Sequence, residues 1–431
     1  MASTHVRIGG RVAASSWHRL GWVPVAAVLL GAGWGSNQFT PMLLVYSRTL
    51  GLGTGTLAAM FGFYALGLIP GLLVAGPTSD ARGRRVVVLP GAGLSLLATL
   101  ALAAGGRSVA LLFLGRLLTG LGTGAVFGAG TAWLREASRS LGGHADDTQA
   151  ARRAAIAMTT GFALGPLAAG LLAQWAPAPT VVPYLPHLAL MALVLAWLPA
   201  APDTVVASRA GAPRLSPPGL RSARFRTVVA PMAPWVFAAP AIAFALLPKI
   251  VGADRVTDGI ALTATIAMLT ALAGVLVQPL GRRLQAGARG NRAAATGLSV
   301  LAAGLVLGAV TAHERQVWLL VPASIVLGCA YGLCLVAGLV EVQRLADQRT
   351  LATLTAVFYT LAYLGFAAPF LLALAVRLAS YPTLLTVAAA LALGTAALVT
   401  RQPWPLGNRH QRPGAATMRR PHDGDADAKR I

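Results

Sequence analysis

The stretch GPTSDARGRR, residues 76–85, places one acid among three arginines between two long apolar runs. A turn this short cannot bury its charges, so we expect it at the level of the lipid headgroups. Gly76 and Gly83 would allow tight backbone conformations there. Asp80 would be stabilised at a helix N-terminus by the helix dipole. The alternative is that these charges only fix the orientation of the flanking helices, but that role would need neither Asp80 nor the glycine spacing.

Arg116 is a second unusual charge, because it lies inside the apolar run 109–134. A charge in this position costs roughly 2.5–3.5 kcal/mol on membrane-insertion scales and indicates a function by default. It could attract an anionic or electron-rich group in a cavity of low dielectric constant. The alternative is a side chain that extends to the outer headgroups. Gly120, Gly124 and Gly128 recur every four residues and predict a groove in which another helix packs closely.

Residues for other chemistry are missing from the sequence. It contains no G-x-x-x-x-G-K-[ST] phosphate loop, and HERQV from His313 lacks the second histidine of a helical zinc site. We find no Ser-His-Asp or Cys-His grouping and no pair of carboxylates within an apolar run. The sequence therefore predicts no enzyme, no metal site and no cofactor. An enzyme, a sensor or a channel remains a minor alternative.

The elements that carry these residues are predicted from composition. The chain has 431 residues, of which 56% are hydrophobic and 11% charged, and its mean hydropathy is +0.67. A soluble domain would have roughly a quarter of its residues charged. About 20 apolar residues span a bilayer as a helix. The sequence predicts an all-α membrane protein with spans at 21–46, 55–76, 86–105, 109–134, 153–175, 180–200, 227–250, 259–280, 293–311, 317–341, 351–376 and 382–400.

The net charge of +22 indicates topology rather than nucleic-acid binding. Most Lys and Arg residues fall in the loops on the side that carries both termini, and cytoplasmic loops hold such an excess. We therefore expect both termini in the cytoplasm, an affinity for the lipid bilayer and no nucleic-acid partner. The predominance of arginine suggests a GC-rich bacterial genome, and hence the bacterial inner membrane.

The predicted spans divide into two sets of six. A six-helix bundle is expected over 1–200, a cytoplasmic linker over 201–226, a second bundle over 227–400 and a disordered cytoplasmic tail over 401–431. Two six-helix halves related by an axis along the membrane normal are a known transporter arrangement.

The motifs resemble those of the major facilitator superfamily. Gly76, Asp80, Gly83, Arg84 and Arg85 match its signature between spans two and three, G-x-x-x-D-x-x-G-R-K/R. The resemblance implies that Asp80 latches the first half to the start of span eleven, near Thr350, when the transporter opens outward. It also implies that Glu136, at the end of span four, shares this charge network.

Spans four and five resemble two further signatures of the family. In GRLLTGLGTGAVFGAG, Arg116 precedes the glycine-rich run that includes Gly122. GFALGPLAAG resembles the antiporter signature G-x-x-x-G-P-x-x-G-G and departs from it at Ala169. The matching residues are Gly161, Gly165, Pro166 and Gly170. Pro166 would bend or loosen the helix. The bend could seal the cavity on one side, or it could be a static kink.

The resemblance also implies which spans surround a central cavity. The polar and aromatic residues on those spans are candidates to line it: Trp34, Asn37, Gln38, Trp235, Tyr331, Tyr359 and Tyr363. His187, in span six, lies outside the expected cavity, and we interpret it as structural.

The sequence as a whole predicts a secondary transporter that acts as a monomer and exports small organic molecules by proton antiport. The alternative is uptake or facilitated transport of a metabolite such as a sugar or organic acid. Since no acid lies well inside a span, we expect neutral or anionic substrates, with protons binding at Asp80 or Glu136.

Overall fold

The computed structural model describes residues 21–139, 147–202, 218–286, 291–346 and 350–402. Within these ranges the regular structure is helical. Eleven helices are long and apolar enough to cross a membrane, and they correspond to predicted spans two to twelve. Predicted span one is divided at Gln38 into α2 and α3, of 15 and 12 residues, so neither piece spans a bilayer alone.

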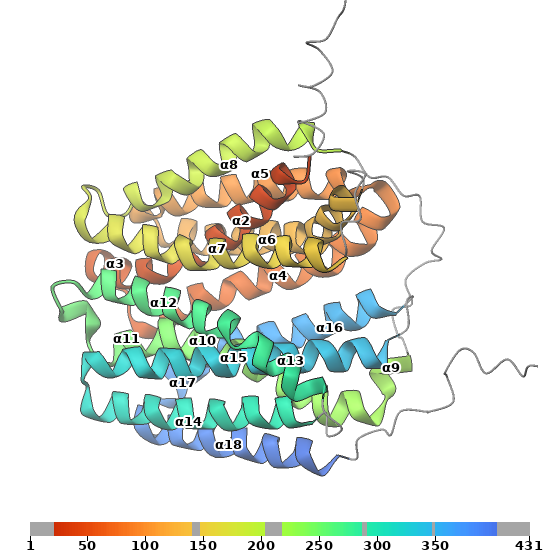
Figure 1. Ribbon diagram of the computed structural model, residues 1–431. Coiled ribbons are helices and arrows are strands. Elements are labelled where there is room, and N and C mark those ends of the chain that lie inside the picture. The colour runs from red at the N-terminus through yellow and green to blue at the C-terminus, as the bar shows by residue number, and fades with distance from the viewer. Residues whose placement is uncertain (1–20, 140–146, 203–217, 287–290, 347–349, 403–431) are drawn as a thin grey trace, which may run out of the picture.

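The helices of the first half pack on one another and form the upper part of Figure 1. They are α2 (Val23–Asn37), α3 (Phe39–Leu50), α4 (Thr54–Arg82), α5 (Arg84–Ala104), α6 (Val109–Arg139), α7 (Asp147–Trp175) and α8 (Leu185–Trp197), with 3-10 turns η1 (Gly105–Arg107), η2 (Val182–Tyr184) and η3 (Leu198–Ala200).

The second half forms the lower part of Figure 1. It contains α9 (Pro218–Arg221), the π-helical turn η4 (Phe225–Val229), α10 (Ala230–Ala241), the π-helical turn η5 (Ile242–Leu246), α11 (Leu247–Ile250), η6 (Ala253–Arg255), α12 (Gly259–Leu276), α13 (Gln278–Ala286), α14 (Arg292–Glu314), η7 (Val317–Leu319), α15 (Leu320–Leu345), α16 (Leu351–Tyr363), η8 (Leu364–Ala367), α17 (Ala368–Ala375) and α18 (Tyr381–Arg401). The domain boundaries at residues 200, 226 and 400 stay predictions, since 203–217 and 403–431 lie outside the described residues.

We call the end of the molecule with Gly83 and the last turns of α6, α15 and α18 the basic end, and the other the opposite end. Two predicted loops at the basic end are largely helical. Residues 76–82 form the last two turns of α4, and residues 278–286 form α13. Hydropathy marks only the apolar core of a span, whereas the backbone hydrogen bonds of the helix continue into its charged flank.

Small residues let α4 and α6 approach closely. A Cβ added at Gly120 would lie 2.1 Å from the carbonyl oxygen of Tyr64, and one at Gly124 would lie 2.5 Å from that of Leu68. Gly67 and Gly71 of α4 are equally close to the backbone of α6. The predicted groove on span four is therefore present, and α4 occupies it.

The two halves meet through α3, α4 and α7 on one side and α12, α16, α17 and η8 on the other. Their ribbons adjoin at the opposite end and diverge toward the basic end (Figure 1). All hydrogen bonds between described residues of different halves lie at the opposite end.

Candidate functional site

Arg84 forms the centre of an ion-pair cluster at the basic end of the first half. Gly83, with φ of +98°, is the only residue between α4 and α5, so Arg84 begins α5 one turn beyond Asp80. The Arg84 guanidinium donates to both oxygens of Glu136 on α6, at 2.8–3.3 Å, to Ser79 Oγ at 2.8 Å and to Asp80. This cluster joins the ends of three spans.

The structure corrects two parts of the predicted turn. Asp80 lies in the last turn of α4, at a helix C-terminus and not at an N-terminus, so the helix dipole does not stabilise its charge as predicted. Gly76 lies inside α4, and a Cβ there would meet no atom within 4 Å, so its backbone is not unusual. Asp80 is half exposed and pairs with Arg84 rather than with the other half. Because the halves adjoin at the opposite end, the latch between Asp80 and Thr350 stays a prediction for the other conformation. Arg85 donates to the carbonyl of Ala201 at 2.6 Å and so holds the end of span six.

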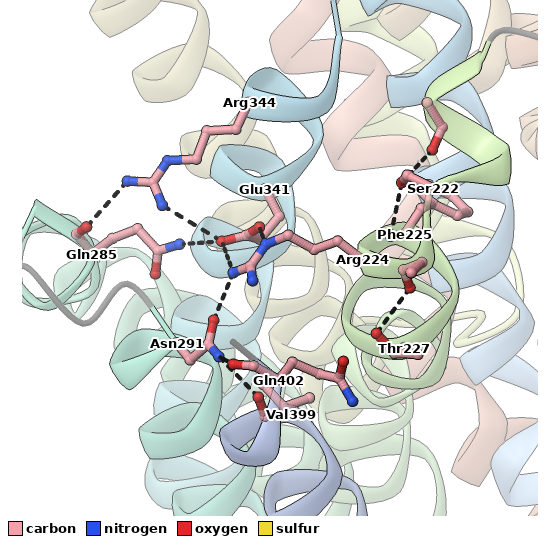
Figure 2. Close-up of polar contacts among 12 residues, drawn as sticks. Ser222, Arg224, Phe225, Thr227, Gln285, Asn291, Glu341, Arg344, Val399 and Gln402 are labelled. Carbon is pink, nitrogen blue, oxygen red and sulfur yellow. Dashed lines mark hydrogen bonds and ion pairs between the residues drawn. The ribbon is translucent and has the colours of Figure 1, made fainter. Parts of the chain in front are cut away.

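A second cluster surrounds Glu341 in the other half (Figure 2). Its carboxylate is 1% exposed and accepts two hydrogen bonds from Arg224, at 2.6 and 3.1 Å, and one from Gln285 Nε2, at 3.0 Å. Arg224 also donates to Asn291 Oδ1 at 2.6 Å, and Asn291 Nδ2 donates to main-chain oxygens at the end of α18. Glu341 ends span ten as Glu136 ends span four, a parallel that was visible in the sequence.

Arg116 is fully buried between α2, α4 and α6, so the alternative that it extends to the headgroups is wrong. Nη1 donates to the carbonyl of Ser36 at 3.2 Å and Nε to that of Met60 at 3.4 Å, whereas Nη2 has no hydrogen-bond partner among the described residues. The guanidinium carbon lies 4.7–5.5 Å from the ring centres of Phe39, Phe61 and Tyr64. No carboxylate of the described residues pairs with it. Rings and carbonyls offset part of its desolvation cost.

The break in span one coincides with this arginine. The carbonyl of Ser36 lies in the last turn of α2, where backbone oxygens lack helical partners and the dipole favours a cation. On the other side of the break, Gln38 Nε2 donates to Thr99 Oγ1 at 3.2 Å. His187 Nε2 donates to the carbonyl of Gly31 at 3.0 Å, which leaves Nδ1 to accept from Thr99 at 2.9 Å. His187 therefore makes structural contacts, as expected.

The glycines of α7 face two different partners. A Cβ at Gly161 or Gly165 would lie 2.2 or 2.6 Å from backbone oxygens of α2, whereas one at Gly170 would lie 2.2 Å from Cβ of Ala264 on α12, in the other half. α7 is a continuous helix through the buried Pro166, so this residue does not interrupt the helix.

The predicted cavity residues do not all face the space between the halves. Gln38 is fully buried and bonds to α5, and Trp235 Nε1 donates to Thr395 of α18 at 3.3 Å. Each thus bonds within its own half, and their role in lining the cavity stays a prediction, because hydropathy gives the depth of a residue and not the helix face on which it lies. Trp34 and Asn37 are partly exposed on α2. Tyr331, Tyr359 and Tyr363 form one aromatic cluster with Phe237.

A set of contacts at the opposite end was not predicted from the sequence. Arg48 donates to the carbonyls of Asp254, at 2.6 Å, and Val256, at 2.9 Å. Lys249 donates to Ser47 Oγ and to the Asp254 carboxylate, both at 2.6 Å. Gln174 donates to the carbonyl of Thr257 at 2.7 Å and accepts from the amide of Ile260. We call Ser47, Arg48, Gln174, Lys249 and Asp254 the lock, since these residues join the halves.

A helical membrane protein of two bundles, joined at one end and carrying charge clusters at the other, has the architecture of a secondary transporter. The chain matches the family model of the Major Facilitator Superfamily over residues 25–369 and belongs to that family. It is accordingly a multi-pass membrane transporter of small molecules and not an enzyme.

Solved structures share this fold. The chain is 14% identical to the nucleoside transporter NupG, with a TM-score of 0.67 over 90% of this chain and 100% of that one. It is 13% identical to a POT family transporter in complex with 5-aminolevulinic acid, with a TM-score of 0.70 over 88% and 95%. It is 16% identical to a peptide transporter POT in complex with sulfate, with a TM-score of 0.71 over 89% and 95%. No curated relative matches the chain.

Proposed function

We propose that the chain exports small organic molecules in exchange for protons across the bacterial inner membrane, and that it acts as a monomer. The positive charge at the basic end supports a cytoplasmic location for that end and for both termini. In this orientation the lock closes the outer side, and the described conformation is the one in which the halves separate toward the cytoplasm. Substrate would then enter from inside the cell.

The observation that carries the export proposal is the position of Gly170. Gly161 and Gly165 of the antiporter-like signature pack against α2, within the first half, and Gly170 contacts Ala264 across the halves. A small residue at this contact lets α7 and α12 close the outer side tightly. Tight closure would prevent protons from leaking between the halves while substrate is bound.

The preference for neutral or anionic compounds is supported by Arg116. Its guanidinium stays protonated at physiological pH, and its Nη2 is a buried donor with no partner. It cannot carry the coupling proton, so we propose that protons bind at Asp80 or Glu136. A dication would meet the field of an uncompensated arginine in a medium of low dielectric constant.

The alternative is uptake or facilitated transport of a metabolite such as a sugar or organic acid. The similar structures favour it to some extent, since one is a nucleoside transporter and another contains 5-aminolevulinic acid. Nucleosides and 5-aminolevulinic acid are both polar metabolites. The sequence identity to these proteins is too low to assign either compound as a substrate of this chain.

Accumulation in cells tests the direction of transport. Under the export proposal, deletion of the gene raises accumulation of a transported compound, and a protonophore removes the difference between deletion and parent strains. Lower accumulation in the deletion strain would support uptake instead.

Reporter fusions test the orientation. Fusions after Ala145 and Gly211, two positions outside the described residues, should report the cytoplasm, and one after Gly106 the outer side. A reversed result at any of the three would contradict the proposed topology.

A further inference from the structure

Aromatic rings of three elements of the second half lie nearly parallel at mid-depth. The ring of Phe237 on α10 stacks on Tyr363 of α16, with centres 4.4 Å apart and planes at 11°, and on Phe366 of η8, at 5.1 Å and 20°. Tyr359 continues the stack from Tyr363 at 6.2 Å and 29°, and Tyr331 of α15 lies beside Phe237 at 5.6 Å. We call Phe237, Tyr331, Tyr359, Tyr363 and Phe366 the ring platform.

Contacts with the first half show where the platform lies. Phe61 and Tyr64 of α4 meet Phe366 and Tyr363 edge-on, with planes at 74–79°. The same two residues of α4 lie beside the Arg116 guanidinium. The platform therefore lies where the halves meet, next to the buried charge of the first half, and not on the lipid-facing surface.

Part of the platform is exposed, and its tyrosine hydroxyls make no hydrogen bond to a described residue. Phe237, Tyr331 and Tyr359 are partly exposed although they lie at mid-depth. The hydroxyls of Tyr331, Tyr359 and Tyr363 bond to no described residue, yet none is among the buried atoms without a partner, so each reaches the accessible surface. Buried tyrosine hydroxyls usually find a partner. These three hydroxyls therefore keep an unused donor for a molecule that binds beside them.

We infer that the ring platform binds the transported molecule, and that this molecule contains a planar aromatic ring with oxygen or nitrogen acceptors on its edge. A flat ring continues a parallel stack with larger contact than a saturated ring, because aromatic pairs favour offset stacking. The tyrosine hydroxyls donate to the edge acceptors. An acidic group on the ring is drawn toward Arg116. The inference deepens the proposed function and depends on it.

Binding to purified protein in lipid nanodiscs tests the inference, with empty nanodiscs as the blank. The probes are 2-naphthoate, a planar anion; coumarin, a planar neutral compound; and decalin-2-carboxylate, a saturated anion with the skeleton of naphthoate. The variants are Phe237→Leu, which removes the central ring, and Tyr359→Phe, which removes one donor. Phe113→Leu is the matched control, since Phe113 pairs with Phe63 inside the first half, at 4.6 Å and 71°.

We expect the two planar probes to bind at least tenfold more tightly than decalin-2-carboxylate. Phe237→Leu should weaken their binding by roughly tenfold or more, the range of single aromatic stacking contacts, and Phe113→Leu should not. Tyr359→Phe should weaken it severalfold.

Equal binding of planar and saturated anions would overturn the inference, as would equal effects of Phe237→Leu and Phe113→Leu. Export of saturated compounds alone, in the accumulation assay, would also overturn it while leaving the proposed function intact. If cells show no protonophore-sensitive export of any compound, the proposed function is wrong, and the inference that depends on it falls with it.

Discussion

At the scale of single residues, the two charges that the sequence singles out, Asp80 and Arg116, have opposite environments. Asp80 and its partner Arg84 lie at a helix end where water screens them, and such pairs contribute about 0–1 kcal/mol to stability. Arg116 is removed from water and is held by carbonyls and rings. Changes at Asp80 should therefore affect function more than stability, whereas changes at Arg116 should affect both.

We predict that Asp80→Asn reduces transport sharply while the protein level in the membrane and the melting temperature stay close to those of the parent. The amide loses the charge that the latch needs in the outward-open conformation, and Asp80→Glu, which shifts the charge, should be intermediate. Transport assays in vesicles and a thermal-shift measurement check both parts. Normal transport by the Asn variant would reduce residues 76–85 to an orientation signal.

For Arg116 we predict a change in selectivity. In vesicles, Arg116→Gln should abolish the preference for anionic over cationic competitors of similar size, because Gln carries no charge. Arg116→Lys should keep part of that preference but transport at least tenfold more slowly, since an ammonium cannot reproduce the planar contacts to two carbonyls. Arg107→Gln, at an exposed arginine of η1, is the control. A preference for cations in the parent would contradict the prediction.

At the scale of elements, helix contacts depend on glycines whose positions leave no room for a side chain. We predict that Gly165→Leu abolishes net export, because the new side chain would push α2 away from α7. Gly93→Leu on α5, where a Cβ meets no atom within 4 Å, is the matched control. Radiolabelled export by the two variants at equal protein level gives the comparison, and equal activities would refute this reasoning.

Pro166→Ala tests coupling separately from packing. We predict that this variant binds substrate as the parent does but transports fewer protons per substrate, if the missing backbone hydrogen bond of α7 contributes to closure. Calorimetric binding and a pH-sensitive dye in the same vesicles measure the two quantities. Full coupling in both Pro166→Ala and Gly165→Leu would contradict a role of these two residues in antiport.

The sequence predicted the positions of the membrane-spanning helices better than the directions in which their faces point. Eleven spans and a close-packing groove on α6 follow from apolar length and glycine spacing. The break at Gln38 was not predicted, although Pro41 lies three residues beyond it and cannot donate to the carbonyl of Asn37. The polar contacts beside the break, from Arg116 to Ser36 and from Gln38 to Thr99, involve distant spans. A helix that is apolar on all sides shows no amphipathic pattern, so the sequence does not indicate which way Trp235 or Gln38 points.

At the scale of the whole molecule, the lock should control which end is open. We predict that Lys249→Met, which removes the cation between Ser47 and Asp254, increases the population with the opposite end open. Spin labels at Arg107 and Arg315, exposed residues of the two halves at that end, should show an additional longer distance by double electron–electron resonance. Cys329→Ser and Cys334→Ala would remove the native thiols. Glu314→Gln is the control, and an unchanged distance distribution would exclude this role for Lys249.

The lock also determines how freely its two sides can diverge in evolution. Arg48 and Gln174 donate to the main-chain oxygens of residues 254, 256 and 257. A main-chain oxygen is retained in any substitution that preserves the backbone conformation. The hydrogen bonds from Arg48 and Gln174 therefore do not depend on which side chains the connection of residues 254–257 carries. In homologues we therefore expect Arg48 and Gln174 to be conserved while Val256 and Thr257 vary. Asp254 should vary less, because its carboxylate accepts a hydrogen bond from Lys249. The hydrogen bonds of Arg48 and Gln174 to this connection would persist through such variation, because their acceptors are main-chain oxygens that every amino acid has.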